Sequence, residues 1–413
     1  MTRNAPTSRR ALLTRLGLAA GLAYAAPTLQ GLGVARASGA SVSRPVIRRR
    51  RAARPEMVVL LAPGQSAEPL RQAGYAVLAQ RSNATLAREA LRLRLPPGRN
   101  PAQARAEIAR LLPGALAEPN ALYRPDALTC EGDDCAAQRL IGWQPADRTA
   151  RPRIGMIDTG VNPDHPALRG QDLEVNQIEL DGRDAAGRMH GTAVAALLIG
   201  RPEGRAPGLL PAARLIAVEA FHSRADGAAA DAFSLLGALD ILIQARVQVI
   251  NMSFSGPRNP VLRQIVQSAR DAGIGLVASA GNGGPGAAPA FPAAWPEVIA
   301  VTAVDAERRP YRQAARGEHV ALAAPGVNLW TAASVEGGRL RSGTSYAAPF
   351  VSAAMAIGMA RDGLSAAEAR RRLFTCAADL GDAGRDPVFG HGLIVSPSAC
   401  AGGQDRIFSV GTE

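Results

Sequence analysis

Apolar runs alternate with helix-like segments along most of the chain after about residue 126. The runs are continuously apolar, as in strands buried on both faces, and lie at 154–158, 215–220, 247–252, 274–280, 298–304 and 320–323. Helical periodicity fills the intervals at 190–200, 229–246, 259–272, 344–361 and 365–375. This alternation is typical of a parallel sheet covered by helices on both faces. It predicts an α/β fold with a doubly wound, mostly parallel sheet, whose functional residues gather where the strands end.

A different pattern precedes this region. Residues 57–61 and 75–78 read as strands around a short helix at 67–73, and 91–95 alternates apolar and basic residues as a half-buried strand does. Asn100-Pro101 opens a further helix with proline at its first position. The order β-α-β-β-α-β predicts a small ferredoxin-like α+β domain over residues 56–125. An unrelated small α/β domain is the alternative that the pattern leaves open.

The N-terminus has the features of an export signal. Ser8-Arg9-Arg10 precedes a mildly apolar stretch at 16–26, and Ala35-Arg36-Ala37 supplies a small-x-small cleavage site. We therefore assign residues 1–37 to a twin-arginine-like signal and 38–55 to an arginine-rich linker. An ordinary secretory signal and a cytosolic N-terminal helix are the alternatives. No later stretch has the roughly 18 consecutive apolar residues of a spanning helix, so we expect an exported protein, periplasmic or secreted, without stable membrane insertion.

The basic excess is confined to one part of the chain. The formal charge is +12, and lysine does not occur. Residues 1–125 hold 20 Arg and 5 acidic residues, whereas 126–413 hold 27 Arg and 30 acidic residues. The main domain is thus slightly acidic, which argues against a nucleic-acid partner.

Four cysteines fit an oxidising compartment. Cys130 and Cys135 bracket a short acidic loop, and Cys376 and Cys400 lie near the C-terminus. Four cysteines allow three connectivities, and we favour the local pairs 130–135 and 376–400. A zinc site is the competing interpretation, although the chain lacks a C-x-x-C unit.

Three short segments supply a carboxylate, an imidazole and a hydroxyl. They are Ile157-Asp158-Thr159-Gly160-Val161, His190-Gly191-Thr192-Ala193 and Gly343-Thr344-Ser345-Tyr346-Ala347-Ala348-Pro349. Asp158 would orient the imidazole, His190 would act as general base and then acid, and Ser345 would be the nucleophile. We expect Ser345 at the start of a helix, with Pro349 in its first turn, where a proline costs no hydrogen bond.

The order Asp, His, Ser and the residues around each of them resemble those of the subtilisin-like serine peptidases. The resemblance covers roughly residues 150–396. It implies that Asn282, in Ala280-Gly281-Asn282-Gly283, donates its amide to the oxyanion together with the Ser345 N–H. It also implies an inhibitory pro-domain at 56–125, ahead of a catalytic domain at 126–413.

The same resemblance assigns the substrate cleft. Ser253, Phe254 and Ser255 match the edge strand that pairs with an extended peptide, while Gly281 and Ala290 match the pocket for the residue before the scissile bond. Ser255 and Ala290 stand where the family usually has glycine, so we expect a narrowed pocket that prefers small or medium side chains.

No organic cofactor is implied. Many relatives have a calcium-ligating aspartate where this chain has Ala167. Losing a carboxylate weakens an oxygen-ligand cage, so a structural calcium ion is left open but a high-affinity site is not expected.

These features predict an exported serine endopeptidase that cleaves proteins or peptides through an acyl-enzyme, as a monomer. Its own pro-domain would be an intramolecular inhibitor, released by self-cleavage near Tyr123-Arg124. Two alternatives stand beside this hypothesis: a catalytically silent relative that binds peptides in the cleft, and a dedicated processing protease for one partner protein.

Overall fold

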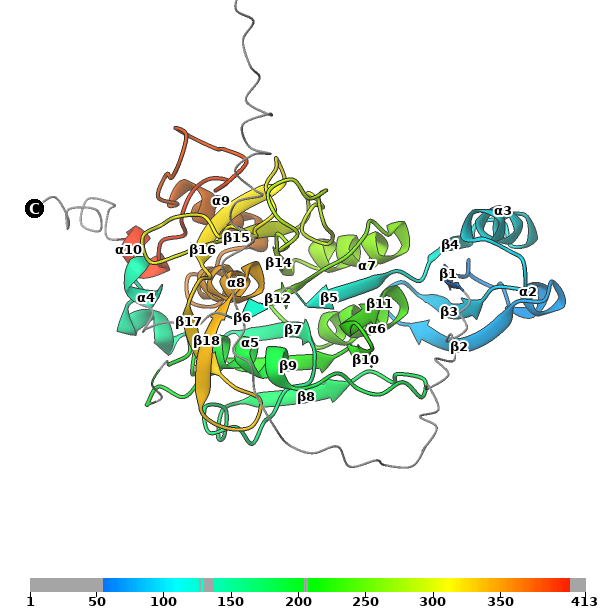
Figure 1. Cartoon of the computed structure of the whole chain (residues 1–413), viewed down its shortest axis with the longest axis horizontal. Coiled ribbons are helices and arrows are strands. Elements are labelled where there is room, and N and C mark those ends of the chain that lie inside the picture. Colours follow the sequence, from blue (N-terminus) through cyan, green and yellow to red (C-terminus); the bar gives the residue numbers. More distant parts are fainter. Residues whose placement is uncertain (1–54, 126–127, 130–136, 204, 206, 402–413) are drawn as a thin grey trace, which may run out of the picture. The chain divides into compact units, whose positions relative to one another are not determined.

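A seven-stranded parallel sheet forms the centre of the computed structural model (Figure 1), which describes residues 55–125, 128, 129, 137–203, 205 and 207–401. The predicted export signal, most of the linker, Cys130 and Cys135 lie outside this described part. The strand order is β16 (Val320–Pro325), β15 (Ile299–Val304), β14 (Gly275–Ser279), β12 (Val249–Met252), β7 (Arg153–Asp158), β9 (Arg214–Glu219) and β8 (Leu173–Gln177).

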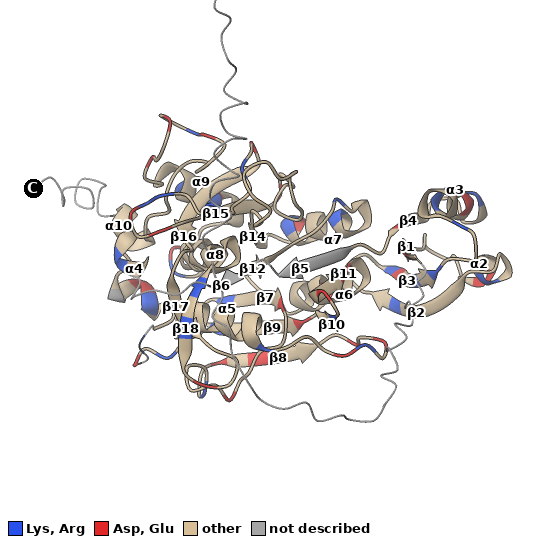
Figure 2. Ribbon diagram, viewed as in Figure 1, with Lys and Arg blue, Asp and Glu red and all other residues tan. Residues whose placement is uncertain are grey.

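Helices cover both faces of this sheet, as the doubly wound prediction requires. Alternate residues of β7 enter different cores: Ile154 and Met156 pack with the helices of one face, and Ile157 with those of the other. The first face carries α5 (Met189–Ile199), α8 (Thr344–Ala360) and α9 (Ala366–Thr375), and the second α6 (Ala232–Gln244) and α7 (Pro260–Asp271). Figure 2 shows the charged residues mainly on loops and helices, with uncharged stretches in the central strands.

The predicted fold class is confirmed, and the six apolar runs all become strands of this sheet. The edge strand β8 was missed because its sequence, Leu-Glu-Val-Asn-Gln, is exposed at every second or third position rather than continuously apolar. Short hairpin strands were also missed, since two to five residues give too little periodicity to identify them from sequence.

A second, antiparallel sheet precedes the large one, and we call it with its helices the N-terminal module (residues 55–119). The strand order is β2 (Ala76–Asn83), β3 (Arg88–Arg94), β1 (Glu56–Leu60) and β4 (Leu116–Pro119), with helices α2 (Glu68–Gln72) and α3 (Pro101–Leu111). Asn100 caps α3 by accepting the Gln103 N–H, and the Gln103 side chain accepts the Asn100 N–H in return. The element order and the sheet order are those of a ferredoxin-like α+β fold, as expected.

The two faces of β1 pack against different partners. Met57 and Val59 belong to the module's own core, together with Ile108 of α3. Val58 and Leu60 belong instead to the core shared with α6 and α7. The module is therefore joined to the main fold by buried apolar surface.

Two small sheets complete the fold. One has the order β10 (His222–Arg224), β11 (Gly227–Asp231), β5 (Leu122–Pro125) and β13 (Phe254–Ser255); the other is β17 (Leu329–Ala332), β18 (Gly338–Ser342) and β6 (Leu128–Thr129). The remaining elements are α4 (Ala137–Leu140), a 3-10 helix at Pro145–Thr149 and α10 (Pro397–Ala401).

Cys376 and Cys400 form a disulfide with a Cα–Cα distance of 5.7 Å. None of the helices in the described part of the chain has the length and apolar character of a membrane span.

Candidate active site

Asp158 and His190 meet where β7 ends and α5 begins. The His190 Nδ1 lies 2.6 Å from Asp158 Oδ1, and that oxygen also accepts the Thr159 N–H at 2.7 Å. Only 2% of Asp158 and 6% of His190 is exposed. A buried carboxylate hydrogen-bonded to Nδ1 fixes the ring's tautomer and leaves Nε2 available to a substrate or nucleophile.

Gly191 permits this approach of α5 to the end of β7. A Cβ at Gly191 would lie 2.5 Å from the Thr159 carbonyl oxygen and 2.7 Å from that of Gly160. The space is instead closed by a hydrogen bond from the Gly191 N–H to Thr159 Oγ1, at 2.9 Å. Glycine is therefore required here by close backbone packing.

Ser345 is the second residue of α8 and is fully buried. The prediction that Pro349 lies in the first turn is wrong, because Pro349 is the sixth residue of the helix. A proline there cannot donate to the carbonyl four residues earlier, which is that of Ser345. That carbonyl accepts a hydrogen bond from Ser253 Oγ instead, at 2.8 Å.

A chain of buried hydrogen bonds extends this substitute contact back into the helix. Ser352 Oγ donates to Asn251 Oδ1 at 2.9 Å, and Asn251 Nδ2 donates to Ser253 Oγ at 2.9 Å. The start of α8 is thereby attached to the end of β12. Asn251 and Ser352 were not identified from the sequence, since only the fold brings them together.

Asn282 lies three residues beyond β14, next to Ser345. Its Oδ1 accepts hydrogen bonds from both the N–H and the Oγ1–H of Thr344, each at 3.1 Å. These two donors fix the side chain with its amide nitrogen turned away from Thr344. The Nδ2 is buried and has no hydrogen-bond partner among the described residues.

Besides Asp158 Oδ2, three polar atoms at this centre have no hydrogen-bond partner among the described residues. They are His190 Nε2, Ser345 Oγ and Asn282 Nδ2, and each is buried without a hydrogen bond within the described part of the chain. Catalytic hydrogen bonds are often long before a substrate is bound. The arrangement thus leaves a base, a hydroxyl and an amide donor available to a ligand.

The predicted pocket residues surround Gly281, whose φ of +105° favours glycine. A Cβ at Gly281 would lie 3.6 Å from Ala290 Cβ, 3.8 Å from Ala315 Cβ and 3.9 Å from Ser255 Oγ. Ser255 and Ala290 therefore both add atoms to one small space. Ala315 is a third contributor that the sequence did not reveal.

The other predicted substrate residues lie on β13 and immediately before it. Phe254 and Ser255 form β13, while Ser253 is used for the bond to Ser345. β13 pairs antiparallel with β5, with Phe254 opposite Pro125 and Ser255 opposite Arg124. β5 in turn pairs with β11 on its other side.

Two large buried side chains beside Ser345 were also missed. The Tyr346 ring lies 5.3 Å from the His190 ring, and burial raises the Tyr346 pKa. Arg341, on β18, is 2% exposed.

The segment with Ala167 contains local hydrogen bonds. His165 Nδ1 accepts the Ala167 N–H at 3.0 Å, so Nε2 is the atom that donates to the Gly337 carbonyl, also at 3.0 Å. Burial lowers the His165 pKa, which favours this neutral form. Across the residues that the structure describes, no three His, Cys, Asp or Glu side chains gather as a metal site would require.

Comparison with known proteins agrees with this geometry. The subtilase family profile matches residues 150–392. The minor extracellular protease Epr of Bacillus subtilis is 32% identical over 256 residues, covering 61% of this chain and 39% of the relative, so the chain spans well under half of that protein. Subtilisin DY of Bacillus licheniformis is 31% identical over 255 residues, 59% of this chain and 89% of the relative.

Solved structures give the same result. The protease domain of PatA, in the form of a point mutant, superposes with a TM-score of 0.55 at 27% identity, covering 61% of this chain and 97% of that one. Fervidolysin from Fervidobacterium pennivorans gives a TM-score of 0.70 at 20% identity over 84% of this chain and 61% of its own, which supports the fold alone. The family profile spans more than half of the chain and covers the fold that carries Asp158, His190 and Ser345, so this chain belongs to the subtilase family of serine endopeptidases.

Proposed function

We propose that this chain is an exported serine endopeptidase made as a precursor that its own N-terminal module restrains. Ser345 Oγ attacks the peptide carbonyl while His190 Nε2 takes its proton, and Asp158 stabilises the imidazolium that forms. His190 then protonates the leaving amine, and water activated by the same imidazole hydrolyses the acyl-enzyme. The Asn282 Nδ2 and the Ser345 N–H would stabilise the oxyanion.

The observation that carries the precursor proposal is the pairing of β5. An extended peptide substrate binds such a cleft by adding a strand to an exposed edge. In this chain, residues 122–125 already form that strand, antiparallel to both β13 and β11. The segment that leads out of the N-terminal module would therefore compete directly with substrate.

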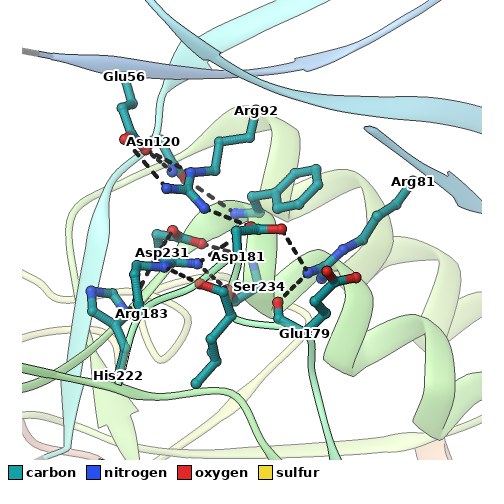
Figure 3. A network of polar contacts seen from close by, with 12 residues as sticks. Glu56, Arg81, Arg92, Asn120, Glu179, Asp181, Arg183, His222, Asp231 and Ser234 are labelled. Atoms are coloured by element: carbon teal, nitrogen blue, oxygen red, sulfur yellow. Dashed lines mark hydrogen bonds and ion pairs between the residues drawn. The ribbon is translucent and has the colours of Figure 1, made fainter. Parts of the chain in front are cut away.

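Polar contacts attach the module to the main fold as well (Figure 3). Arg92 of β3 donates to both oxygens of Glu56, at 2.8 and 3.4 Å, and to Asp181 Oδ2 of the main fold at 2.6 Å. Its side chain is only 7% exposed. Such a desolvated, multiply bonded guanidinium is a stronger contact than a surface ion pair.

This network continues through Arg183 to β11, which pairs with the cleft strand β5. Arg183 pairs with Asp231 and lies 3.8 Å from Asp181 Oδ2. Asp231 is the last residue of β11, where it is paired with Leu122 of β5, and it also caps α6 by accepting the Ser234 N–H at 2.8 Å. Arg183 therefore lies between Asp181, which binds Arg92 of the module, and Asp231, which pairs with the cleft strand.

The β2–β3 turn makes a further contact with α6. Asp240 accepts the N–H groups of Ala84 at 3.1 Å and Thr85 at 2.9 Å. Asn120, just after β4, accepts the Phe233 N–H at the start of α6, at 3.2 Å. The module and the residue that directly follows it therefore contact α6 near its middle and its start, which supports a specific inhibitory complex.

The strand register also supports a position for the proposed self-cleavage. Pro125 lies opposite Phe254 on one side of Ser345, and Leu128 lies opposite Ser342 on the other. The bonds between Pro125 and Leu128 are the ones that connect these two paired segments. We therefore move the proposed cleavage point from Tyr123-Arg124 to a bond within this interval.

Reaction with a fluorophosphonate probe tests the chemistry. We expect the probe to label the purified wild-type protein and not Ser345→Ala. We also expect the wild-type protein to hydrolyse unfolded proteins before it is treated with the probe, and not afterwards. Absence of labelling and of hydrolysis in the wild type would instead support the silent peptide-binding alternative.

N-terminal sequencing tests the processing. We expect the wild type to be trimmed within 125–128 and Ser345→Ala to keep its full length. Trimming of pure Ser345→Ala to the same size would refute self-cleavage. The relative Epr is named as an extracellular protease, which supports secretion of this chain. Cell fractionation tests the secretion.

The small pocket favours a second candidate, a protease selective for a restricted set of partner proteins. Ser255, Ala290 and Ala315 narrow the space beside Gly281. PatA and PagA, two structural neighbours, are described as maturation proteases. Cleavage of many unrelated proteins, or efficient cleavage after Phe or Tyr, would exclude this candidate.

A further inference from the structure

Arg341 has no assigned role in the mechanism, yet it is the largest fully buried side chain beside the nucleophile. It lies on β18, four residues before Ser345, and is 2% exposed. Its Nε and Nη2 are buried and have no hydrogen-bond partner within the described residues. Buried guanidinium groups are normally paired, because an unpaired charge is costly to remove from water.

The two free atoms form one edge of the guanidinium. Nε–H and the neighbouring Nη2–H point in parallel, and this edge binds the two oxygens of a carboxylate side by side. Burial lowers the Arg341 pKa and Arg339 lowers it further, while Tyr346 opposes this. Among the described residues, Arg341 forms no ion pair with a carboxylate, and its free edge is suited to a carboxylate that arrives with a ligand.

The position of β18 indicates which ligand that is. β6 pairs antiparallel with β18, with Leu128 opposite Ser342 and Thr129 opposite Arg341. β5, which precedes β6, pairs with β13 on the other side of the nucleophile. A peptide that runs through the cleft in this direction has its leaving-group side along β18.

Register then selects one residue of such a peptide. Directly opposite residues of an antiparallel pair share a face of the sheet, with Cβ atoms about 4.5–5.5 Å apart. The substrate residue that takes the place of Thr129 would therefore lie beside Arg341. Leu128, one residue earlier, occupies a position on the other face.

We propose that Arg341 is a specificity residue on the leaving-group side of the cleft, where it binds a carboxylate of the peptide substrate. The carboxylate is that of an aspartate or glutamate at the Thr129 position, or the terminal carboxylate of a peptide that ends there. The proposal rests on the endopeptidase function, and it adds a preference that the small pocket beside Gly281 does not determine.

The first test compares matched peptides on the processed enzyme. Internally quenched peptides share one sequence, with Ala-Leu ahead of a variable residue at the Thr129 position, which is Asp, Asn or Leu and is followed by further residues. We expect kcat/KM to favour Asp over Asn by roughly tenfold or more, as charge-assisted hydrogen bonds allow. A second pair that ends at this position, as free acid or as amide, separates the terminal carboxylate from the side chain.

Variants of the arginine complete the design. Arg341→Gln should bring the Asp/Asn ratio to about one, and Arg341→Lys should keep part of it, because an ammonium cannot bind both oxygens in parallel. Arg339→Gln is the control, since Arg339 is exposed on the same strand and should change the ratio much less than Arg341→Gln does. Ratios are compared within one enzyme preparation, so partial misfolding does not affect them.

A binding measurement removes the dependence on catalysis. Calorimetric titration with Ala-Leu-Asp-amide and Ala-Leu-Asn-amide should show tighter binding of the Asp peptide, lost in Arg341→Gln. If the wild type cleaves peptides but shows equal kcat/KM and equal binding for Asp and Asn, the carboxylate subsite is wrong and the peptidase stands. If no peptide is cleaved, the peptidase proposal fails, and the binding ratio alone supports or overturns the subsite.

Discussion

Thr344→Val should slow catalysis without weakening substrate binding, because Thr344 positions the amide of Asn282. The substitution removes the hydroxyl that donates to Asn282 Oδ1 at 3.1 Å and accepts the Gly281 N–H at 3.2 Å. Each buried hydrogen bond contributes about 1 kcal/mol, so the two together limit the loss to about 2 kcal/mol, or roughly 30-fold in rate. The Thr344 N–H still donates to Asn282, at 3.1 Å, so we expect a smaller loss of kcat, on the order of tenfold.

A double-mutant cycle separates this positioning role from a structural one. Removing such an amide donor costs about 10²–10³ in kcat, a figure measured in subtilisin, a relative of this chain. With Asn282→Leu in place, Thr344→Val should cost less than about twofold more, since no amide remains to be positioned. The assay is steady-state hydrolysis of a peptide anilide, corrected by active-site titration.

Thr331→Val is the matched control. Thr331 is also buried, and its hydroxyl donates to the Ala193 carbonyl at 2.7 Å, but it does not contact Asn282. It should lower stability and leave kcat per active site unchanged. An equal loss from Thr344→Val with and without Asn282, or a rise in KM in place of the fall in kcat, would refute the reasoning.

Three other changes test the packing, the restraint by the module and the pH dependence of stability. Gly191→Ala should lower the melting temperature and the activity together, since its Cβ would lie within 2.5 Å of a backbone oxygen; unchanged thermal unfolding by calorimetry would contradict this. Arg92→Met should speed processing of the precursor in a gel-based time course, whereas Arg105→Met, which removes an exposed ion pair within the module, should not. Burial, and then the charge of Arg183, lower the His222 pKa to about 4, so the unfolded chain binds more protons than the folded chain between pH 6.5 and 4. The free energy of unfolding should therefore fall by about 3 kcal/mol as the pH drops through this window. Denaturant titrations of an inactive variant should show this pH dependence, and adding His222→Gln should remove it.

Local sequence was sufficient for six of the seven strands of the large sheet, all but the edge strand β8, and it predicts the three catalytic residues. A local signal accompanies each of the three catalytic residues: Asp158 ends a strand, His190 precedes a close-packed glycine, and Ser345 lies at the start of a helix. The six apolar runs needed no tertiary information, because strands buried on both faces are apolar throughout.

What the sequence did not reveal depends on distant contacts. Arg341 and Tyr346 could not be distinguished from surface residues, because their burial arises only when β18 and α8 pack against the rest of the fold. Pro349 was wrongly placed in the first turn, since nothing local shows that Ser253 takes the role of the missing donor. Ser253 is 92 positions from Ser345 in the chain, so their contact depends on the fold. Sequence also locates a helix boundary only to within a few residues.

Asp231 connects the two ways in which the N-terminal module contacts the main fold. Its backbone pairs with Leu122 in the cleft strand, and its carboxylate binds Arg183 and caps α6. Arg183 also lies near Asp181, the partner of Arg92 in the module. Withdrawal of the cleft strand therefore disturbs the acceptors that bind the module, and loss of Arg92 leaves Asp181 free to compete for Arg183. We infer that the strand and the module leave the enzyme cooperatively, so that cutting the chain near Ser345 weakens both contacts and not the strand alone.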